Sequence, residues 1–236
     1  MPRSKFPLSE IYDKLVRKGG YFNYPLIVDV LCDILGKNKD VLELCVGTGN
    51  VALPMLEKGF TMTGIDHDAE MLKTLQEKQN DKPTRVTCVA TSASEFNLGK
   101  KFDAIYIHSG HLIFNISEVE LFLNERKKLD KTKTFESVSK HLKPSGLFII
   151  NIERWNDLTI KLEDGSVYHR TIFEETEKHG TRLHSFFDGP SGKMHFEPVK
   201  KQRRYPLKMV EEELRNLGFA NFENYLDMFF VCTFEG

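Results

Sequence analysis

Residues 40–58, DVLELCVGTGNVALPMLEK, place a short apolar run, a Gly-Thr-Gly turn and a helical pattern directly after one another. The apolar run at 40–46 has the length and composition of a buried strand. Gly47 and Gly49 permit a tight turn in which the backbone comes close to a ligand. A helix that begins near Asn50 would present free N–H groups and the positive end of its dipole to an anionic group. This order of elements predicts a nucleotide-like ligand at the turn.

A carboxylate follows the second expected strand. That strand, at 60–65, ends at Asp66, which lies 66 − 47 = 19 residues after Gly47. A carboxylate at this position can accept hydrogen bonds from both ribose hydroxyls of a nucleotide. The alternative is that Gly47 and Gly49 only form a tight turn and that Asp66 only caps a helix at 68–78. The two features together favour the nucleotide site.

Strand and helix patterns alternate as far as Ile152. We expect further strands at 85–90, 102–107 and 147–152, a long amphipathic helix at 118–142 with a break near Lys131, and a turn at 143–146. Parallel strands need crossover connections, which are usually helices. The predicted fold class is therefore α/β, with a Rossmann-like sheet that carries helices on both faces.

The sequence after Ile152 has a different pattern. Its polar and aromatic runs predict strands at 166–175, 181–188 and 193–204, joined by turns at His179-Gly180 and 189–192, then a helix at 207–217 and strands at 222–226 and 228–234. Two amphipathic helices are expected near the N-terminus, at 8–18 and 22–35. We interpret 1–236 as a single domain, made of a helical cover (1–37), a cofactor-binding core (38–152), a small antiparallel lid that holds substrate (153–206), and a closing helix and strands (207–236).

Composition disfavours several classes of protein. Of the 236 residues, 33 are Lys or Arg and 34 are Asp or Glu, and a net charge of −1 disfavours a nucleic-acid partner. The longest apolar runs are strand-sized and the first residues carry no apolar signal region, so we expect a cytoplasmic protein with no membrane partner. The four cysteines are scattered and the histidines lack ligand spacing, which predicts no metal site.

The glycine-containing turn is also compatible with a dinucleotide. Residues 47–52, GTGNVA, satisfy the G-x-G-x-x-A form of the NAD(P) fingerprint, so an NAD(P)-dependent oxidoreductase is the rival hypothesis. Against it, Glu43 lies at the end of the strand before the turn, where an acid suits a ligand with a positive centre better than a pyrophosphate. A third hypothesis is a non-catalytic module that binds the cofactor.

At four places the sequence resembles the class I S-adenosylmethionine-dependent methyltransferases. The matching segments, spread over roughly residues 38–152, are VLELCVGTG at 41–49, GID at 64–66, FDAIYI at 102–107 and LKPSGLF at 142–148. The resemblance implies a seven-stranded sheet whose last strand is antiparallel. It also implies that the methionine part of the cofactor lies over Gly47 and Gly49 and that Asp66 binds the ribose. S-adenosyl-L-methionine would be the cofactor and S-adenosyl-L-homocysteine the product.

Two residues depart from the pattern of that family. Cys45 stands where the family commonly has glycine, and Ser92 stands where an acid often contacts adenine. The predicted cofactor-binding residues are Tyr21, Glu43, Cys45, Gly47, Thr48, Gly49, Asp66, His67, Ser92, Ala93 and His108. For His108, a role as a core histidine is an equal alternative.

A narrower resemblance is to small-molecule N-methyltransferases that dimethylate amino sugars and, more loosely, to glycine methyltransferases. It rests on Tyr12-Asp13, Tyr21, SGHL at 109–112, Trp155, His195-x-Glu197 and Arg204-Tyr205. It implies that the first tyrosines fold over the cofactor and that His111 lies near the acceptor nitrogen. The segment at 124–135 is longer than its counterpart in that group, so the acceptor itself is not carried over.

The acceptor site must remove a proton if the acceptor is an amine. The amine has to be neutral when it attacks, and histidine, with a pKa of about 6.5, is suited to take its proton. His111 is the candidate base or orienting residue, with a supporting role behind the site or a helix-capping role as the alternatives. Tyr12 is the second catalytic candidate, and for Tyr12 and Tyr21 the alternative is packing in an amphipathic helix. The predicted substrate residues are Trp155, Tyr168, His195 and Arg204, each of which core packing or a solvated strand also explains.

These observations predict a methyltransferase that uses S-adenosylmethionine to methylate a small molecule, on nitrogen in preference to oxygen, by in-line displacement. An O-methyltransferase is the alternative within the same class. The expected partner is the small-molecule substrate, and the expected assembly is a monomer or a homodimer.

Overall fold

The computed structural model describes residues 22–108, 114–116, 130–152, 157–175, 179–204 and 206–236. The chain divides into two compact units. The larger unit comprises Tyr24–Ile113, Leu129–Glu153 and Pro206–Gly236, and the smaller unit comprises Met1–Asn23, Phe114–Lys128 and Arg154–Tyr205. The interpretation of 1–236 as a single domain stays a prediction.

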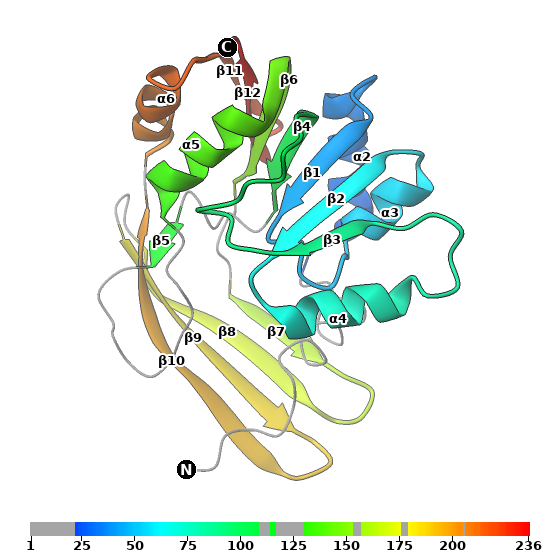
Figure 1. Cartoon of the computed structure of the whole chain (residues 1–236). Helices are drawn as coiled ribbons and strands as arrows, with labels where there is room; N and C mark the ends of the chain where they lie inside the picture. Colours follow the sequence, from blue (N-terminus) through cyan, green and yellow to red (C-terminus); the bar gives the residue numbers. More distant parts are fainter. Residues whose placement is uncertain (1–21, 109–113, 117–129, 153–156, 176–178, 205) are drawn as a thin grey trace. The chain divides into compact units, whose positions relative to one another are not determined.

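The larger unit is built on a seven-stranded sheet in the order β11-β12-β6-β4-β1-β2-β3 (Figure 1). Its strands are β1 (Asp40–Leu44), β2 (Thr61–Asp66), β3 (Thr87–Ala90), β4 (Phe102–Ile107), β6 (Leu142–Asn151), β11 (Phe219–Tyr225) and β12 (Phe229–Phe234). Strands β6, β4, β1, β2 and β3 pair in parallel, whereas β12 is antiparallel to both β6 and β11. The predicted sheet, with its last strand antiparallel, is confirmed.

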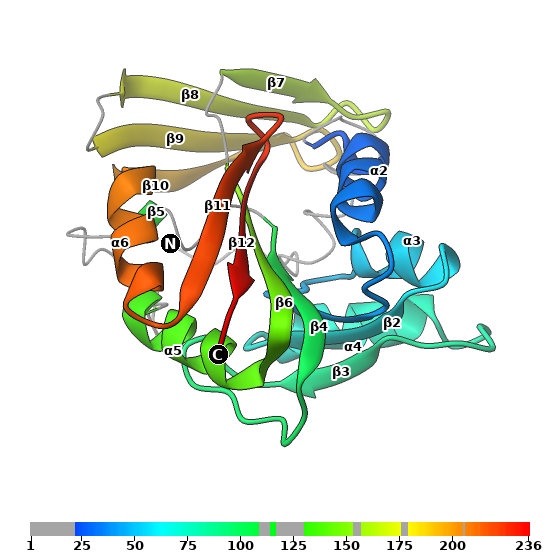
Figure 2. The same cartoon turned by 90° about the horizontal axis from the view of Figure 1, so that it is seen from above.

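Helices cover both faces of this sheet, as the sequence predicts. They are α2 (Tyr24–Leu35), α3 (Ala52–Glu57), α4 (Ala69–Lys78), α5 (Lys131–His141) and α6 (Leu207–Arg215). Helices α5 and α6 lie on one face and α2 and α3 on the other (Figure 2). Because both faces are covered, the central strands have no solvent side, and Val41, Leu42 and Leu44 of β1 are all completely buried.

Side chains at the helix starts fix where two of these helices begin. Asp68 precedes α4, and its carboxylate accepts hydrogen bonds from the N–H groups of Glu70 and Met71. Asp130 precedes α5 and accepts from the N–H of Lys133. Such caps satisfy backbone donors that have no partner within the helix. The expected break near Lys131 coincides with the start of α5, and the earlier part of the expected helix lies outside the described residues.

Strand β6 contains a bulge where the sequence predicts a turn. Leu142 pairs with Phe102 and Leu147 with Ala104, so residues 143–146 face a single residue of β4. Ser145 has a φ of 61°. A Cβ on Gly146 would lie 2.8 Å from the carbonyl oxygen of Lys143 and 3.1 Å from that of Asp103. The chain therefore does turn at 143–146, as predicted, but this turn is a bulge within β6. The strand begins at Leu142, earlier than predicted.

The smaller unit is a five-stranded antiparallel sheet in the order β5-β10-β9-β8-β7. Its strands are β5 (Phe114–Ile116), β7 (Leu158–Lys161), β8 (Val167–Glu175), β9 (His179–Asp188) and β10 (Lys193–Arg204). The predicted antiparallel lid corresponds to β8, β9 and β10. The prediction is wrong for His179-Gly180, which lies in β9 and not in a turn, and it did not include the short strands β5 and β7.

The described helices include none that is both long and apolar enough to cross a lipid bilayer. The expected N-terminal helix at 8–18 lies outside the described residues, whereas the second expected helix is α2.

We predict that Gly146→Ala lowers the free energy of unfolding by about 1–3 kcal/mol, because the new methyl group overlaps two backbone carbonyl oxygens that cannot move independently. Chemical denaturation followed by circular dichroism measures this change. The matched control is Ser145→Ala, an exposed neighbour in the same bulge, which should change stability by less than about 0.5 kcal/mol. Equal stabilities for the two variants would contradict the packing argument.

Candidate functional site

The turn after β1, residues 45–49, has the backbone of a ligand-binding loop; we call it the glycine turn. Gly47 and Gly49 have φ values of 55° and 78°. A Cβ on Gly47 would have none of the described heavy atoms within 4 Å, whereas a Cβ on Gly49 would clash with the side chain of Leu75 from α4. Gly49 therefore allows close packing of the turn on a helix, and Gly47 leaves the outer side of the turn open to a ligand.

The backbone conformation at Cys45 explains why related sequences commonly have glycine at this position. Its φ is 57°, in the left-handed region that favours glycine. The commoner glycine at this position is thus a backbone requirement, and Cys45 meets it with strain. Burial and the nearby carboxylates of Asp66 and Glu43 raise the pKa of its thiol, so it is not a reactive thiolate.

Asp66 connects the glycine turn to the end of β2. Its carboxylate accepts hydrogen bonds from the N–H of Gly47 and from the N–H of Asp68, both at 2.9 Å. Its backbone carbonyl accepts from the N–H of Thr91, just beyond β3. A carboxylate has about four acceptor positions, so Asp66 can still receive further donors such as ribose hydroxyls. The alternative role as a helix cap belongs to Asp68 instead.

Glu43 is a buried acid in β1, two residues before the glycine turn. It is 3% exposed, and the hydroxyl of Tyr106 on β4 donates a hydrogen bond to its carboxylate at 2.6 Å. The pKa of Glu43 is raised to about 8, mainly by burial and also by the charge of Asp66, while the hydrogen bonds from Tyr106 and from the N–H of Ala52 act in the opposite direction. Below that pH the carboxyl group retains its proton.

Lys78 is a site residue that the sequence did not reveal. From the last turn of α4 its ammonium group donates to the carbonyl oxygen of Thr48, at 2.8 Å. The amide of Asn50 donates to the Thr48 hydroxyl at 3.2 Å. These bonds hold the middle of the glycine turn from its inner side. A lysine 30 residues away has no sequence signal for this contact.

Four more predicted cofactor residues lie after β2, β3 and β4. His67 is half-exposed, with Nδ1 3.4 Å from a carboxylate oxygen of Asp66. The Ser92 hydroxyl accepts a hydrogen bond from the N–H of Ser94, which shapes a turn in which Ala93 is buried. His108 is buried, and its ring centroid lies 5.5 Å from that of Tyr24. The carboxyl ends of parallel strands are where ligands bind in this class of fold.

The structure thus places ten of the predicted cofactor residues at the carboxyl ends of four adjacent strands, β3, β2, β1 and β4: Glu43, Cys45, Gly47, Thr48, Gly49, Asp66, His67, Ser92, Ala93 and His108. Tyr12, Tyr21, His111 and Trp155 lie outside the described residues. Their roles stay predictions.

The three remaining substrate candidates belong to the smaller unit. Tyr168 is buried in a hydrophobic cluster around Ile160. His195 is half-buried, and its ring centroid lies 6.3 Å from that of Phe186. Arg204 lies in β10, where its backbone pairs with Phe114 of β5, and its side chain is outside the described part. Packing accounts for the position of Tyr168, and the substrate role of all three residues stays a prediction.

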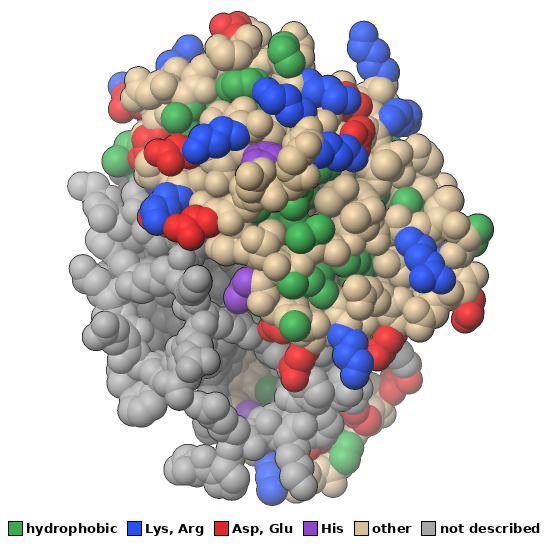
Figure 3. All heavy atoms as spheres, in the orientation of Figure 1, with side chains coloured by type: hydrophobic (Ala, Val, Ile, Leu, Met, Phe, Trp, Pro, Cys, Tyr) green, Lys and Arg blue, Asp and Glu red, His purple; other side chains and the backbone are tan. Residues whose placement is uncertain are grey.

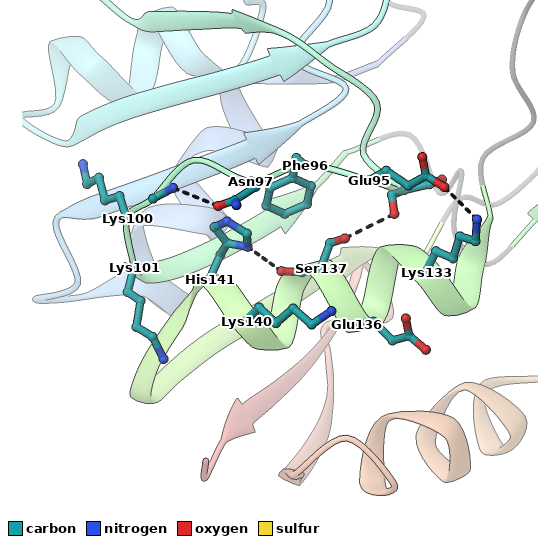
Figure 4. Close-up of a pocket in the computed structure, with 12 residues that line it drawn as sticks. Glu95, Phe96, Asn97, Lys100, Lys101, Lys133, Glu136, Ser137, Lys140 and His141 are labelled. Carbon is teal, nitrogen blue, oxygen red and sulfur yellow. Dashed lines mark hydrogen bonds and ion pairs between the residues drawn. The ribbon is translucent and has the colours of Figure 1, made fainter.

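A groove of about 690 Å³ lies elsewhere on the larger unit, between the segment before β4 and helix α5 (Figure 4). Basic side chains gather on this part of the surface (Figure 3). The rings of Phe96 and His141 are 4.5 Å apart, and His141 bonds through both nitrogens, to the carbonyl of Ser137 and the N–H of Leu98. The described lining of the groove includes none of the predicted site residues. Some of its polar groups bond to one another, among them Lys133 with Glu95 and Ser137 with the carbonyl of Ser94.

Within the described part of the chain, no three His, Cys, Asp or Glu side chains come together as a metal site would require.

Comparison with known proteins gives a consistent assignment. Residues 41–146 match a family model described as "Methyltransferase domain". Over 221 residues the chain is 25% identical to YqeM of Bacillus subtilis (strain 168), a curated protein with a provisional methyltransferase name, covering 89% of this chain and 84% of that one.

Two solved structures share the fold over nearly the whole chain. An S-adenosylmethionine-dependent methyltransferase from Clostridium acetobutylicum ATCC 824 has a TM-score of 0.71 at 23% identity and covers 97% of this chain and 98% of its own. The sugar N-methyltransferase KedS8 from Streptoalloteichus sp. ATCC 53650 has a TM-score of 0.69 at 14% identity, and the match covers 100% of this chain and 96% of KedS8. The predicted class I methyltransferase fold is confirmed. The predicted enzyme class, a methyltransferase, is confirmed by the match of residues 41–146 to the family model. The predicted cofactor agrees with the description of the Clostridium protein.

We predict that Cys45→Gly stabilises the protein by about 0.5–1 kcal/mol, because relief of the left-handed strain exceeds the entropy that glycine adds to the unfolded chain. Thermal unfolding measures the change. Cys88→Gly, in the ordinary strand backbone of β3, is the control and should lower stability by a similar amount. A Cys45→Gly protein that unfolds more readily than the wild type would show that the thiol contributes more than the backbone strain removes.

We predict that Glu43→Gln stabilises the protein increasingly as pH rises from about 5 to 8. The folded chain holds a proton on Glu43 that the unfolded chain loses above its ordinary pKa of 4.5, so stability of the wild type falls as pH rises toward 8. The difference should grow by on the order of 1 kcal/mol per pH unit. Unfolding curves at several pH values measure this difference in the free energy of unfolding. A difference that does not change with pH would show that Glu43 is ionised, and not protonated, in the folded protein.

Proposed function

We propose that this methyltransferase transfers a methyl group from S-adenosylmethionine to a small-molecule acceptor, on an amine nitrogen in preference to an oxygen. The single observation that supports it most is the bonding of Asp66. Its carboxylate holds the N–H of Gly47 at 2.9 Å and keeps acceptor capacity for a ribose, beside a glycine turn whose outer side is open.

The residues around the turn fit the parts of this cofactor. Asp66, at the end of β2, suits the ribose hydroxyls, and the open backbone at Gly47 allows the methionine part to approach closely. Glu43, in β1 just before the turn, is an acid near the position where the positively charged part would lie. A dinucleotide would instead bring a pyrophosphate toward this acid, which disfavours the oxidoreductase hypothesis.

S-adenosylmethionine supplies an activated methyl group on a positively charged sulfur. The acceptor nitrogen uses its lone pair to form the new bond to the methyl carbon, while the bonding pair of the broken S–C bond returns to sulfur. The protein therefore has mainly to align the acceptor in line with that bond and to exclude water. The proton that the amine must lose is assigned to His111, with Tyr12 as the second candidate, and both assignments stay predictions.

The choice of nitrogen over oxygen rests on two lines of support. The first is the resemblance of the Ser109–Leu112 segment to small-molecule N-methyltransferases. The second is the similarity in fold to a sugar N-methyltransferase.

The near-neutral net charge of −1 supports a small-molecule acceptor in preference to nucleic acid. We further propose that the protein acts as a monomer or a homodimer.

We expect Asp66→Asn to weaken binding of S-adenosylhomocysteine about 10- to 100-fold, because hydrogen bonds to a charged acceptor contribute about 1.5–3 kcal/mol. Isothermal titration of the purified chain measures the affinity, with NADH titrated in parallel. The matched control is Asp68→Asn, two residues away, since asparagine caps a helix as well as aspartate does and the affinity should be unchanged. Tight binding of NADH without binding of S-adenosylhomocysteine would overturn the proposal, whereas wild-type affinity in Asp66→Asn would remove Asp66 from the ribose contact.

A further inference from the structure

Glu43 and Tyr106 form a hydrogen-bonded pair between two strands of the sheet. They are directly opposite each other in the parallel pairing of β1 with β4. The tyrosine hydroxyl donates to the carboxylate at 2.6 Å, and the two side chains are 3% and 0% exposed. Sixty-three positions separate them in the sequence, so only the register of the sheet brings them together. A hydrogen bond in such a dry place fixes the orientation of the carboxyl group.

The described groups around this pair include no positive charge that compensates the carboxyl group. Tyr106 from β4 and the backbone N–H of Ala52 at the start of α3 donate hydrogen bonds to it, while Asp66 at the end of β2 repels its charge. The neighbouring thiols, Cys45 in the glycine turn and Cys32 on α2, both have raised pKa values and are neutral. Among the described groups that act on the pKa of Glu43, none is a cation.

The protonation state of Glu43 should depend on the charge of the ligand at the glycine turn, because Glu43 is buried, accepts two hydrogen bonds and lies near a second acid. A carboxylate buried without a counterion is unfavourable, and it accepts a proton from solvent instead. A ligand that brings a positive charge to the open side of the glycine turn would supply the missing counterion. S-adenosylmethionine carries two such charges on its methionine part, the sulfonium and the ammonium group, and one carboxylate, so its net charge is positive.

We propose that binding of the positively charged cofactor is coupled to the release of one proton from the Glu43 carboxyl group to solvent, and that Tyr106 is the positioning residue that holds the resulting carboxylate. The inference rests on the proposed function, because it requires S-adenosylmethionine at the glycine turn. In this deprotonation the carboxyl O–H bond of Glu43 breaks, the electron pair stays on oxygen, and the proton passes to the buffer. Tyr106 does not touch the reacting atoms in this account.

The two residues have different and separable effects. Glu43 is the group that titrates, so Glu43→Gln removes the coupling altogether. The Tyr106 hydrogen bond favours the charged form of Glu43, so Tyr106→Phe raises the pH at which the carboxyl group ionises. The variant is expected to bind the cofactor more weakly near neutral pH and to regain affinity at higher pH. A purely structural role for Tyr106 would weaken binding equally at every pH.

The experiment is isothermal titration of the full-length chain with S-adenosylmethionine in buffers of different ionisation enthalpy, repeated at pH 6, 7, 8 and 9. The dependence of the observed heat on the buffer gives the number of protons released. With Glu43 titrating near 8, we expect about 0.9 proton per site at pH 7 and about 0.1 at pH 9. The probe without charge is 5′-methylthioadenosine, which has the nucleoside and sulfur but neither positive charge, and should release no proton.

Three variants complete the test. Glu43→Gln should bind without proton release, Tyr106→Phe should move the midpoint of release upward by about one pH unit, and Tyr225→Phe, on the edge strand β11, should behave like the wild type. Binding of S-adenosylmethionine without proton release, or release that persists in Glu43→Gln, overturns the inference while leaving the proposed function in place. Absence of any binding at all overturns the proposed function itself. If Tyr106→Phe fails to fold, the comparison of the wild type with Glu43→Gln still decides the coupling.

Discussion

The hydrogen bond from the N–H of Gly47 to the carboxylate of Asp66 is the interaction on which the site depends. It joins the turn after β1 to the end of β2, two neighbouring parallel strands. Because Asp66 also binds the N–H of Asp68 and the N–H of Thr91, one residue connects the turn, the start of α4 and the segment after β3. Replacement of this carboxylate would remove the bonds to Gly47 and Asp68 at once, whereas the bond from Thr91 uses the backbone carbonyl of Asp66 and would stay.

A second buried acid gives the site its electrostatic character. Glu43 and Asp66 lie close enough for the charge of Asp66 to raise the pKa of Glu43, and both are less than a tenth exposed. Two carboxyl groups in a dry place favour a ligand with positive charge and disfavour a pyrophosphate. This difference separates a methyltransferase from a dinucleotide-dependent oxidoreductase more clearly than the glycine pattern does, because both classes use a glycine-rich turn.

The sequence predicted the central sheet well because most of its strands contain short apolar runs, as in β4 and the second half of β6, with turn residues between them. Strand β4, Phe102–Ile107, has the predicted bounds, since it is buried on both faces. Contacts between distant segments could not be predicted in the same way. The bond from Tyr106 to Glu43 depends on sheet register, and the bond from Lys78 to the carbonyl of Thr48 depends on where α4 packs. Short strands such as β7 give too few residues for a periodic pattern.

The most direct test of the account is a crystal structure of the full chain with bound S-adenosylhomocysteine. If the cofactor binds as we propose, both ribose hydroxyls lie within hydrogen-bonding distance of the Asp66 carboxylate and the methionine part lies over Gly47. A ligand bound away from the carboxyl ends of β1 and β2, or a ribose that makes no contact with Asp66, would contradict it.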